Sequence, residues 1–284
     1  MQNKMLDKNR VQDDVNRALA EDVGELDVTA TLIPENTQVT ATVISREPMV
    51  VCGIPWVNCL FNTVNPDIKI TWLVDEGAKL AHAETLCKLT GNARSILTAE
   101  RSALNFLQTL SATATQTHEY CSRLAGYHTQ LLDTRKTIPG LRFAQKYAVV
   151  CGGGVNHRMG LYDAFLIKEN HIKGCGSIAA AVAEARKQNK KALIEVEVEN
   201  ILELKEALAA KPDRIMLDNF SLDTLKQAIR IKGSAPCEFE ASGGVDLTTI
   251  VAIAQTGIDF VSVGAITKSI RAIDLSLLVE GSVS

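Results

Sequence analysis

The sequence lacks the features that mark a disulfide-stapled or membrane-embedded protein. Its seven cysteines are scattered and none form a C-x-x-C pair, which argues against a disulfide framework. We expect most of them to be small, buried, apolar side chains. No apolar run approaches the roughly 20 residues that a membrane span needs, so we expect no membrane partner.

An excess of positive charge is also missing. The chain carries 30 Lys and Arg against 33 Asp and Glu, a net charge of −3, which gives no electrostatic case for a nucleic-acid partner. Residues 1–10 are polar and have no apolar core, so we expect no secretory signal and a reducing, cytoplasmic setting. With 46% hydrophobic residues over 284 positions, the chain can bury one large core or two moderate ones.

The second half of the chain contains a repeated pattern. A short apolar run ends in a charged residue or a glycine pair, and a helical stretch follows. The six runs are 130–132, 164–167, 192–196, 215–217, 237–241 and 260–263. Strands that alternate with helices predict a parallel sheet with covered faces. When such a sheet closes into a barrel, catalytic groups gather at the carboxyl ends of its strands.

The first half follows a different pattern, a helix and short, mostly antiparallel strands, and then a long helix from residue 93 to 110 or on to 124. We therefore predict an N-terminal α+β domain, 1–112, and an α/β domain, 113–268. The last stretch, 269–284, is predicted to be a helix that packs on one of the two domains. Six repeats fit a six- or seven-stranded barrel, and they also fit an open doubly wound sheet.

Cationic side chains cluster after the first strand and around the second strand of this pattern. The cationic residues are Arg135, Lys136, Arg158 and Lys168, and Thr134 and His157 lie next to them in the sequence. Arg binds carboxylate or phosphate oxygens in bidentate fashion, and Lys acts as a point charge. The alternative is a solvated basic turn with a structural histidine. The position at strand ends favours a site for an anion.

Acidic residues and glycine turns end the later strands. Glu197 and Asp218 can hold a divalent metal or accept from ligand hydroxyls, and they can equally be ion-pair partners of the cations. The turns are Ser242-Gly243-Gly244 and Gly264-Ala265, and backbone N–H groups at such strand-to-helix turns can cradle a phosphate. No Ser-His-Asp order, no metal-ligand spacing of Cys and His and no H-E-x-x-H occurs. A multiply charged anion with phosphate is the predicted ligand.

These motifs resemble the quinolinate phosphoribosyltransferase family, and the similarity covers nearly the whole chain. The strings that carry it are 98–108, 133–142, 153–158, 166–171, 195–198, 216–219 and 240–244. The resemblance implies an α/β protein with an N-terminal α+β sandwich and a C-terminal incomplete, six- or seven-stranded TIM-like α/β barrel. It also implies a homodimer, or a higher oligomer, in which Arg101 reaches into the partner's site.

The resemblance further implies a role for each motif. Quinolinate would face Arg135, His157, Arg158 and Lys168. Phosphoribosyl pyrophosphate would be held by Lys136, Ser242, Gly243, Gly244, Val263, Gly264 and Ala265. Thr134 would also bind substrate. Its ribose and Mg²⁺ would face Glu197 and Asp218, the metal directly or through the substrate. The residues implied to take part in the reaction itself are Lys136, Lys168, Glu197 and Asp218.

The implied reaction gives nicotinate mononucleotide, CO₂ and pyrophosphate. The pyridine nitrogen is the nucleophile, so no Ser or Cys nucleophile is needed, in agreement with the residues present. Two alternatives stay open at this point. One is a phosphoribosyltransferase that uses nicotinate, although nicotinate has one carboxylate fewer to occupy the cations. The other is a noncatalytic barrel that binds a phosphate ligand.

Overall fold

The computed structural model describes residues 6–283, with side chains as far as Glu280. The first five residues of the polar 1–10 segment and Ser284, the end of the predicted C-terminal helix, lie outside the described residues. The described chain forms two compact units. Unit 1 comprises the described parts of Met1–His118, Ile138–Gly153 and Ser269–Ser284, and unit 2 comprises Glu119–Thr137 and Gly154–Lys268.

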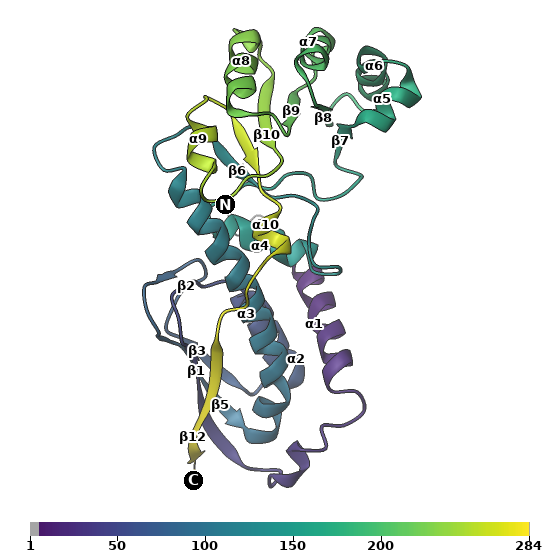
Figure 1. Cartoon of the computed structure of the whole chain (residues 1–284). Coiled ribbons are helices and arrows are strands. Elements are labelled where there is room, and N and C mark those ends of the chain that lie inside the picture. Colours follow the sequence, from purple (N-terminus) through teal and green to yellow (C-terminus); the bar gives the residue numbers. More distant parts are fainter. Residues whose placement is uncertain (1–5, 284) are drawn as a thin grey trace. The chain divides into compact units, whose positions relative to one another are not determined.

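Unit 1 is built on an antiparallel four-stranded sheet in the order β12-β1-β5-β3 (Figure 1). The strands are β1 (Gln38–Ser45), β3 (Lys69–Trp72), β5 (Thr85–Asn92) and β12 (Leu275–Val283), and a short antiparallel pair is formed by β2 (Met49–Val50) and β4 (Lys79–Leu80). Along β1 the alternate residues Val39, Ala41 and Val43 are buried, which gives the sheet one apolar face for the helices to cover.

The helices of this unit begin at recognisable local signals. They are α1 (Lys8–Asp22), the short 3₁₀ helix η2 (Ala30–Leu32), α2 (Ile54–Val64), α3 (Ala93–Arg123, as far as His118) and α4 (Arg142–Cys151). The Asp7 carboxylate caps α1 by accepting from the N–H of Asn9 at 3.0 Å. Both oxygens of Glu76 accept from the N–H groups of Gly53 and Ile54 at the start of α2. Within residues 6–283 no helix combines the length and apolarity needed to cross a bilayer.

The prediction of a C-terminal helix over 269–284 is wrong. The chain there forms β12, which pairs antiparallel with β1 (Figure 1). Ile273 and Leu275 are buried and Leu277 packs against the same core, so the side chains alternate with a period of two. Pairing with the otherwise open edge of β1 satisfies the backbone of this segment and outweighs its helical propensity.

Unit 2 contains a parallel six-stranded sheet with helices between its strands. The strands are β6 (Gln130–Leu132), β7 (Ala164–Ile167), β8 (Leu193–Val198), β9 (Arg214–Asp218), β10 (Glu238–Ser242) and β11 (Phe260–Ser262). The helices are α5 (Glu169–Cys175), α6 (Ile178–Gln188), α7 (Ile201–Ala210), α8 (Leu222–Lys232), α9 (Ile250–Ala254) and α10 (Ala265–Lys268). All six predicted strands are confirmed.

The strand order identifies this sheet as an incomplete barrel. It runs β6-β11-β10-β9-β8-β7, so sequential strands are neighbours and the first strand lies beside the last. A doubly wound sheet would reverse its order in the middle, and that alternative is therefore excluded. The predicted six- or seven-stranded TIM-like barrel is confirmed, with six strands in the described chain and an opening between β6 and β7.

Each of the two units is made of more than one segment of the chain. The segment Ile138–Gly153, between β6 and β7, belongs to unit 1. Its helix α4 contributes Ala144, Tyr147 and Ala148 to the core of that unit. The compact units therefore differ from the predicted division into 1–112 and 113–268. The chain leaves the barrel after β6 and returns before β7, and these are the two strands between which the barrel is open.

Candidate active site

A pocket of about 320 Å³ lies in unit 2 at the carboxyl ends of the strands. It is lined by Thr134, Arg135, Lys136, His157, Arg158, Leu166, Lys168, Glu197, Met216, Asp218, Glu240, Ser242 and Ser262. Nine of these thirteen residues were predicted from the sequence as site residues. Because parallel strands bring their carboxyl ends to one edge, segments more than 100 residues apart in the chain meet here.

Cations crowd one side of the pocket. The guanidinium of Arg158 is partly buried, which lowers its pKa, and the charge of Arg135 lowers it further. Lys168, which follows β7, forms an ion pair with Glu197 on the adjacent strand β8. An anion with two carboxylates would relieve the repulsion between the two arginines, because each guanidinium can bind one carboxylate through two hydrogen bonds.

The loop after β6 is held in a defined shape. The N–H of Lys136 donates to Oγ1 of Thr134 at 3.1 Å, and the Thr267 hydroxyl donates to the Lys136 carbonyl at 2.8 Å. Gly264 lies so close that a Cβ there would be 3.1 Å from Cδ of Lys136. The glycine thus leaves room for the lysine side chain, which keeps a cation beside the last strand-to-helix turn.

The acidic residues Glu197 and Asp218 end neighbouring strands, β8 and β9, and line the same pocket. Asp218 accepts from the side-chain amide of Asn219 at 2.8 Å. Two carboxylates are fewer than a cage made only of protein would need. They suit Mg²⁺, which is usually held by one or two carboxylates together with substrate phosphates and water. The donor set therefore fits the predicted metal.

The glycine turn after β10 has a conformation that other residues rarely adopt. Gly243 has φ +93°, and a Cβ on it would lie 2.1 Å from Oδ1 of Asn219. Asn219 itself has φ +56° and donates its N–H to the Ser242 carbonyl at 2.9 Å. The two turns that follow β9 and β10 are thus interlocked beside Asp218.

A buried charged cluster lies at the base of the pocket. Nε2 of His157 is 2.8 Å from a carboxylate oxygen of Glu195 and 3.4 Å from one of Glu240, and both carboxylates are fully buried. Arg214 approaches Glu240 at 3.6 Å and binds Glu238 at 2.9 Å. Burial and the charge of Glu240 raise the pKa of Glu195 to about 7, so Glu195 is the carboxyl of this pair that takes up a proton more readily.

The charge state of His157 follows from this environment. Burial alone lowers its pKa, but the hydrogen bonds and charges of Glu195 and Glu240 outweigh burial and raise the pKa to about 9. That rise favours the charged ring by about 3 kcal/mol. In the structure Nδ1 accepts from the N–H of Arg158 at 2.8 Å, and a second proton would break this bond. Because such a bond contributes only about 1 kcal/mol, the charged ring is favoured at neutral pH.

The cluster was largely missed at the level of the sequence. Glu195 and Glu197 lie two residues apart on β8 and so share a face of the sheet, while Ile194, Val196 and Val198 lie fully buried on the other face. Glu240 was not singled out, although Glu238-Phe239-Glu240-Ala241-Ser242 alternates in the same way and places it on the face of Ser242. The further lining residues that sequence reasoning missed are Leu166, Met216 and Ser262.

Several predicted site residues do not line the pocket. They are Arg101, Gly243, Gly244, Val263, Gly264 and Ala265. Arg101 lies on α3 in unit 1, where it is exposed. Val263 is buried, and its N–H donates to the Leu132 carbonyl at 3.0 Å, so that amide is used within the barrel. Gly243 and Gly264 affect the pocket indirectly, because they lie against Asn219 and the pocket residue Lys136.

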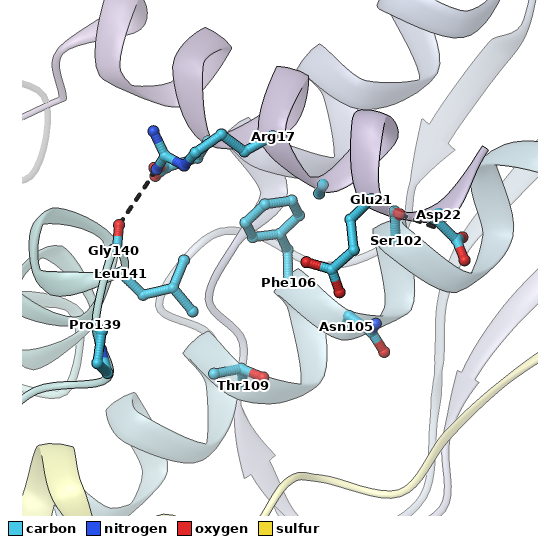
Figure 2. A pocket seen from close by; sticks show the side chains of 12 residues that line it. Arg17, Glu21, Asp22, Ser102, Asn105, Phe106, Thr109, Pro139, Gly140 and Leu141 are labelled. Atoms are coloured by element: carbon cyan, nitrogen blue, oxygen red, sulfur yellow. Dashed lines mark hydrogen bonds and ion pairs between the residues drawn. The ribbon is translucent and has the colours of Figure 1, made fainter. Parts of the chain in front are cut away.

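A second hollow, of about 340 Å³, lies within unit 1 (Figure 2). It is lined by residues of α1, α3 and the turn Pro139–Leu141, and Arg17 donates to the Gly140 carbonyl at 3.2 Å. Its other charged lining residues are the acids Asp14, Glu21 and Asp22. An acidic hollow repels phosphate and carboxylate ligands, so the unit 2 pocket is the candidate active site.

An incomplete barrel with cations, two acids and glycine turns at its strand ends is the arrangement of an enzyme that acts on an anionic, phosphate-bearing substrate. Family models for the N- and C-terminal domains of quinolinate phosphoribosyl transferase match residues 27–111 and 113–278. The chain belongs to the quinolinate phosphoribosyltransferase family.

Individual relatives agree with this assignment. The chain is 40% identical to a probable nicotinate-nucleotide pyrophosphorylase (carboxylating) of Synechocystis, over 91% of this chain and 89% of the relative. It is 38% identical to the Mycobacterium leprae protein of that name, over 94% and 96% of the two chains. The solved structure of the Francisella tularensis nicotinate-nucleotide pyrophosphorylase superposes with a TM-score of 0.93 at 51% identity, covering 97% and 98%. A human nicotinic acid phosphoribosyltransferase, at 12% identity and a TM-score of 0.60, shares the fold alone.

Proposed function

We propose that the protein transfers the phosphoribosyl group of phosphoribosyl pyrophosphate to quinolinate, with release of CO₂ and pyrophosphate, to give nicotinate mononucleotide for NAD biosynthesis. The observation that carries the proposal is the pairing of a crowded cation group, Arg135, Arg158 and Lys168, with two carboxylates, Glu197 and Asp218, in one pocket. The first group suits a dicarboxylate, and the second suits a ribose that develops positive charge.

The proposed position of quinolinate is beside the two arginines. Their guanidinium groups would bind the two carboxylates, and Lys168 would add a third cation. Lys168 is paired with Glu197 before substrate arrives, so a substrate carboxylate would share the ammonium with Glu197. This arrangement would orient the ring nitrogen towards the ribose carbon and convert a bimolecular reaction into an effectively unimolecular one.

Phosphoribosyl pyrophosphate would occupy the other side of the pocket. Lys136 and Ser242 would bind its phosphates, and Glu197 and Asp218 would face its ribose. As the bond to pyrophosphate breaks, the ribose gains oxocarbenium character, which the two carboxylates stabilise. Mg²⁺, when bound by these carboxylates and the diphosphate, would neutralise charge on the leaving group.

Decarboxylation would follow transfer. Once the ring nitrogen carries the ribose it is quaternary and positively charged, so it stabilises the electron pair that stays on the adjacent carbon when the bond to CO₂ breaks. That carbon then takes a proton from water, which completes the product. The cations Arg135 and Arg158 would hold the remaining carboxylate during this step. The protein thus contributes binding, orientation and charge, and no covalent intermediate with a side chain is required.

We also propose that the active enzyme is a homodimer with shared sites. Arg101 is exposed on α3 in unit 1 and is absent from the lining of the unit 2 pocket. An arginine from a second subunit would add a further cation for phosphate. A dimer in which each unit 1 serves the partner's pocket gives this residue a function.

The decisive experiment is an assay of the purified protein with phosphoribosyl pyrophosphate, Mg²⁺ and either quinolinate or nicotinate. We expect equal amounts of CO₂ and pyrophosphate from quinolinate, and kcat/KM for nicotinate lower by about 100-fold or more, since one lost charge-assisted interaction is worth about 1.5–3 kcal/mol and cations are left unpaired. A preference for nicotinate would reject the substrate assignment. Binding of phosphoribosyl pyrophosphate without pyrophosphate release would indicate a noncatalytic barrel.

A further inference from the structure

The histidine at the base of the pocket is anchored by three acidic side chains from different parts of the barrel. Glu195 of β8 and Glu240 of β10 face Nε2 of its ring as ion-pair partners, at 2.8 and 3.4 Å. Asp133, which follows β6, accepts from the backbone N–H of His157 at 2.9 Å. All three acids are fully buried. The ring and the backbone of one residue are therefore fixed at the same time.

This anchoring extends to the neighbouring cation. Arg158 follows His157 directly and lines the same pocket. Its own guanidinium has one long contact with the barrel, 3.5 Å to the Ala164 carbonyl. Its backbone is set by the anchored residue before it and by Asp163, whose carboxylate accepts from the N–H groups of Met159 and Gly160 after it, at 2.7 and 3.0 Å. A small displacement of His157 would consequently move the guanidinium that meets the substrate.

The cluster also controls the charge that the substrate meets. Glu240 lines the pocket, and an unbalanced carboxylate there would repel a dicarboxylate. His157 on one side and Arg214 on the other face this carboxylate. Arg214 is in turn held by Glu238 and by the ring of Phe260, whose centroid is 3.9 Å from the guanidinium carbon.

We propose that Glu195 and Glu240, with Asp133, are positioning residues that hold His157 and Arg158 in the geometry needed to bind the carboxylates of the pyridine substrate. The proposal rests on the proposed function. Neither glutamate takes part in the chemistry itself. Each acts through His157, because a carboxylate both orients the ring through Nε2 and supports its positive charge.

Glu195→Gln and Glu240→Gln test this proposal, and Glu238→Gln is the matched control. Glu238 lies on the same strand as Glu240 and binds Arg214 but not His157. We expect each of the first two variants to raise KM for quinolinate about 10- to 100-fold, as small misplacements of binding groups do. KM for phosphoribosyl pyrophosphate should change less than about threefold. Glu238→Gln should leave both constants near wild type, because the new amide oxygen can still accept from Arg214, which the ring of Phe260 also holds in place.

Two further measurements separate positioning from general damage and from failure of the proposed function. Circular dichroism identifies a variant that does not fold, and the two glutamates lie on different strands, so either variant suffices. NMR of ¹⁵N-labelled histidine reports on the His157 ring without any turnover, and we expect its signal to move in Glu195→Gln and Glu240→Gln but not in Glu238→Gln.

Three results would overturn the proposal. The first is a folded pair of variants with an unchanged KM for quinolinate, and the second is an equal rise of KM for both substrates. The third is an unmoved His157 signal. If the wild-type protein does not turn over quinolinate, the proposed function fails, while the NMR result still decides whether the glutamates hold the histidine.

Discussion

At the scale of single residues, the site depends on charges that compensate one another. Lys168 and Glu197 are paired at the ends of the adjacent strands β7 and β8, and His157 lies between two buried glutamates. Taking an unpaired charge out of water costs several kcal/mol, so the buried His157 and its two glutamates depend on one another, whereas Lys168 is partly exposed. A substrate with two carboxylates can enter because the cations on its side outnumber the acids that face it.

His157 should make the stability of the protein depend on pH. Its pKa is raised in the folded state to about 9 from 6.5. A raised pKa contributes stability that is fully present below the unfolded value and is lost as pH rises through the folded value. We expect wild type to lose about 2 kcal/mol of this contribution between pH 7 and 9.

Urea unfolding of wild type and His157→Gln at several pH values measures this effect. The difference in unfolding free energy between the two proteins should shrink towards pH 9, and groups that do not contact His157 cancel in this difference. Glu195, whose pKa is raised to about 7 and which contacts His157, is controlled by repeating the comparison in the Glu195→Gln background. A constant difference from pH 7 to 9 would mean that His157 is neutral in the folded protein, with Arg158 N–H bound to Nδ1.

At the scale of elements, the local sequence pattern predicted the strands of the barrel correctly. The run 164–167 coincides with β7, and the other five barrel strands were found within two residues, because buried parallel strands are continuous apolar runs between turn signals. The placement of α4 in unit 1 could not be predicted in this way, since it depends on which core accepts Tyr147. The strand β12 was missed because its partner β1 lies more than 200 residues away.

The glycine turn after β10 gives a prediction at this scale. Gly243→Ala should lower kcat/KM for phosphoribosyl pyrophosphate about tenfold or more, because its Cβ would displace Asn219, which binds Asp218. The matched control is Gly257→Ala, with φ +88° but nothing within 4 Å of the new Cβ. Both should lose about 1 kcal/mol of stability from the backbone alone. Equal activity of the two variants, measured by pyrophosphate release, would show that the turn does not support the site.

At the scale of the whole molecule, the residues implied by the family divide between the two compact units. The chain passes from unit 2 to unit 1 after Thr137 and returns after Gly153, so the segments that carry Lys136 and His157 flank the insertion. The pocket of unit 2 collects its cations within a chain of net charge −3. Arg101, in unit 1, is the remaining cation of the family pattern, and in the proposed dimer it would serve the partner's pocket.

Mixing two inactive variants tests that dimer. Arg101→Ala and Arg135→Ala should each be nearly inactive alone. If each site combines Arg135 of one subunit with Arg101 of the other, a heterodimer of the two variants contains one intact site. Unfolding and refolding an equal mixture should then restore about a quarter of wild-type pyrophosphate release, since about half of the dimers are mixed and each of these has one intact site of two.

The matched control is a mixture of Arg135→Ala and Lys168→Ala. Both residues line the same pocket, so every pocket stays damaged and the mixture should stay inactive. Heterodimers isolated by two affinity tags that show no activity would establish that each subunit's site is complete by itself.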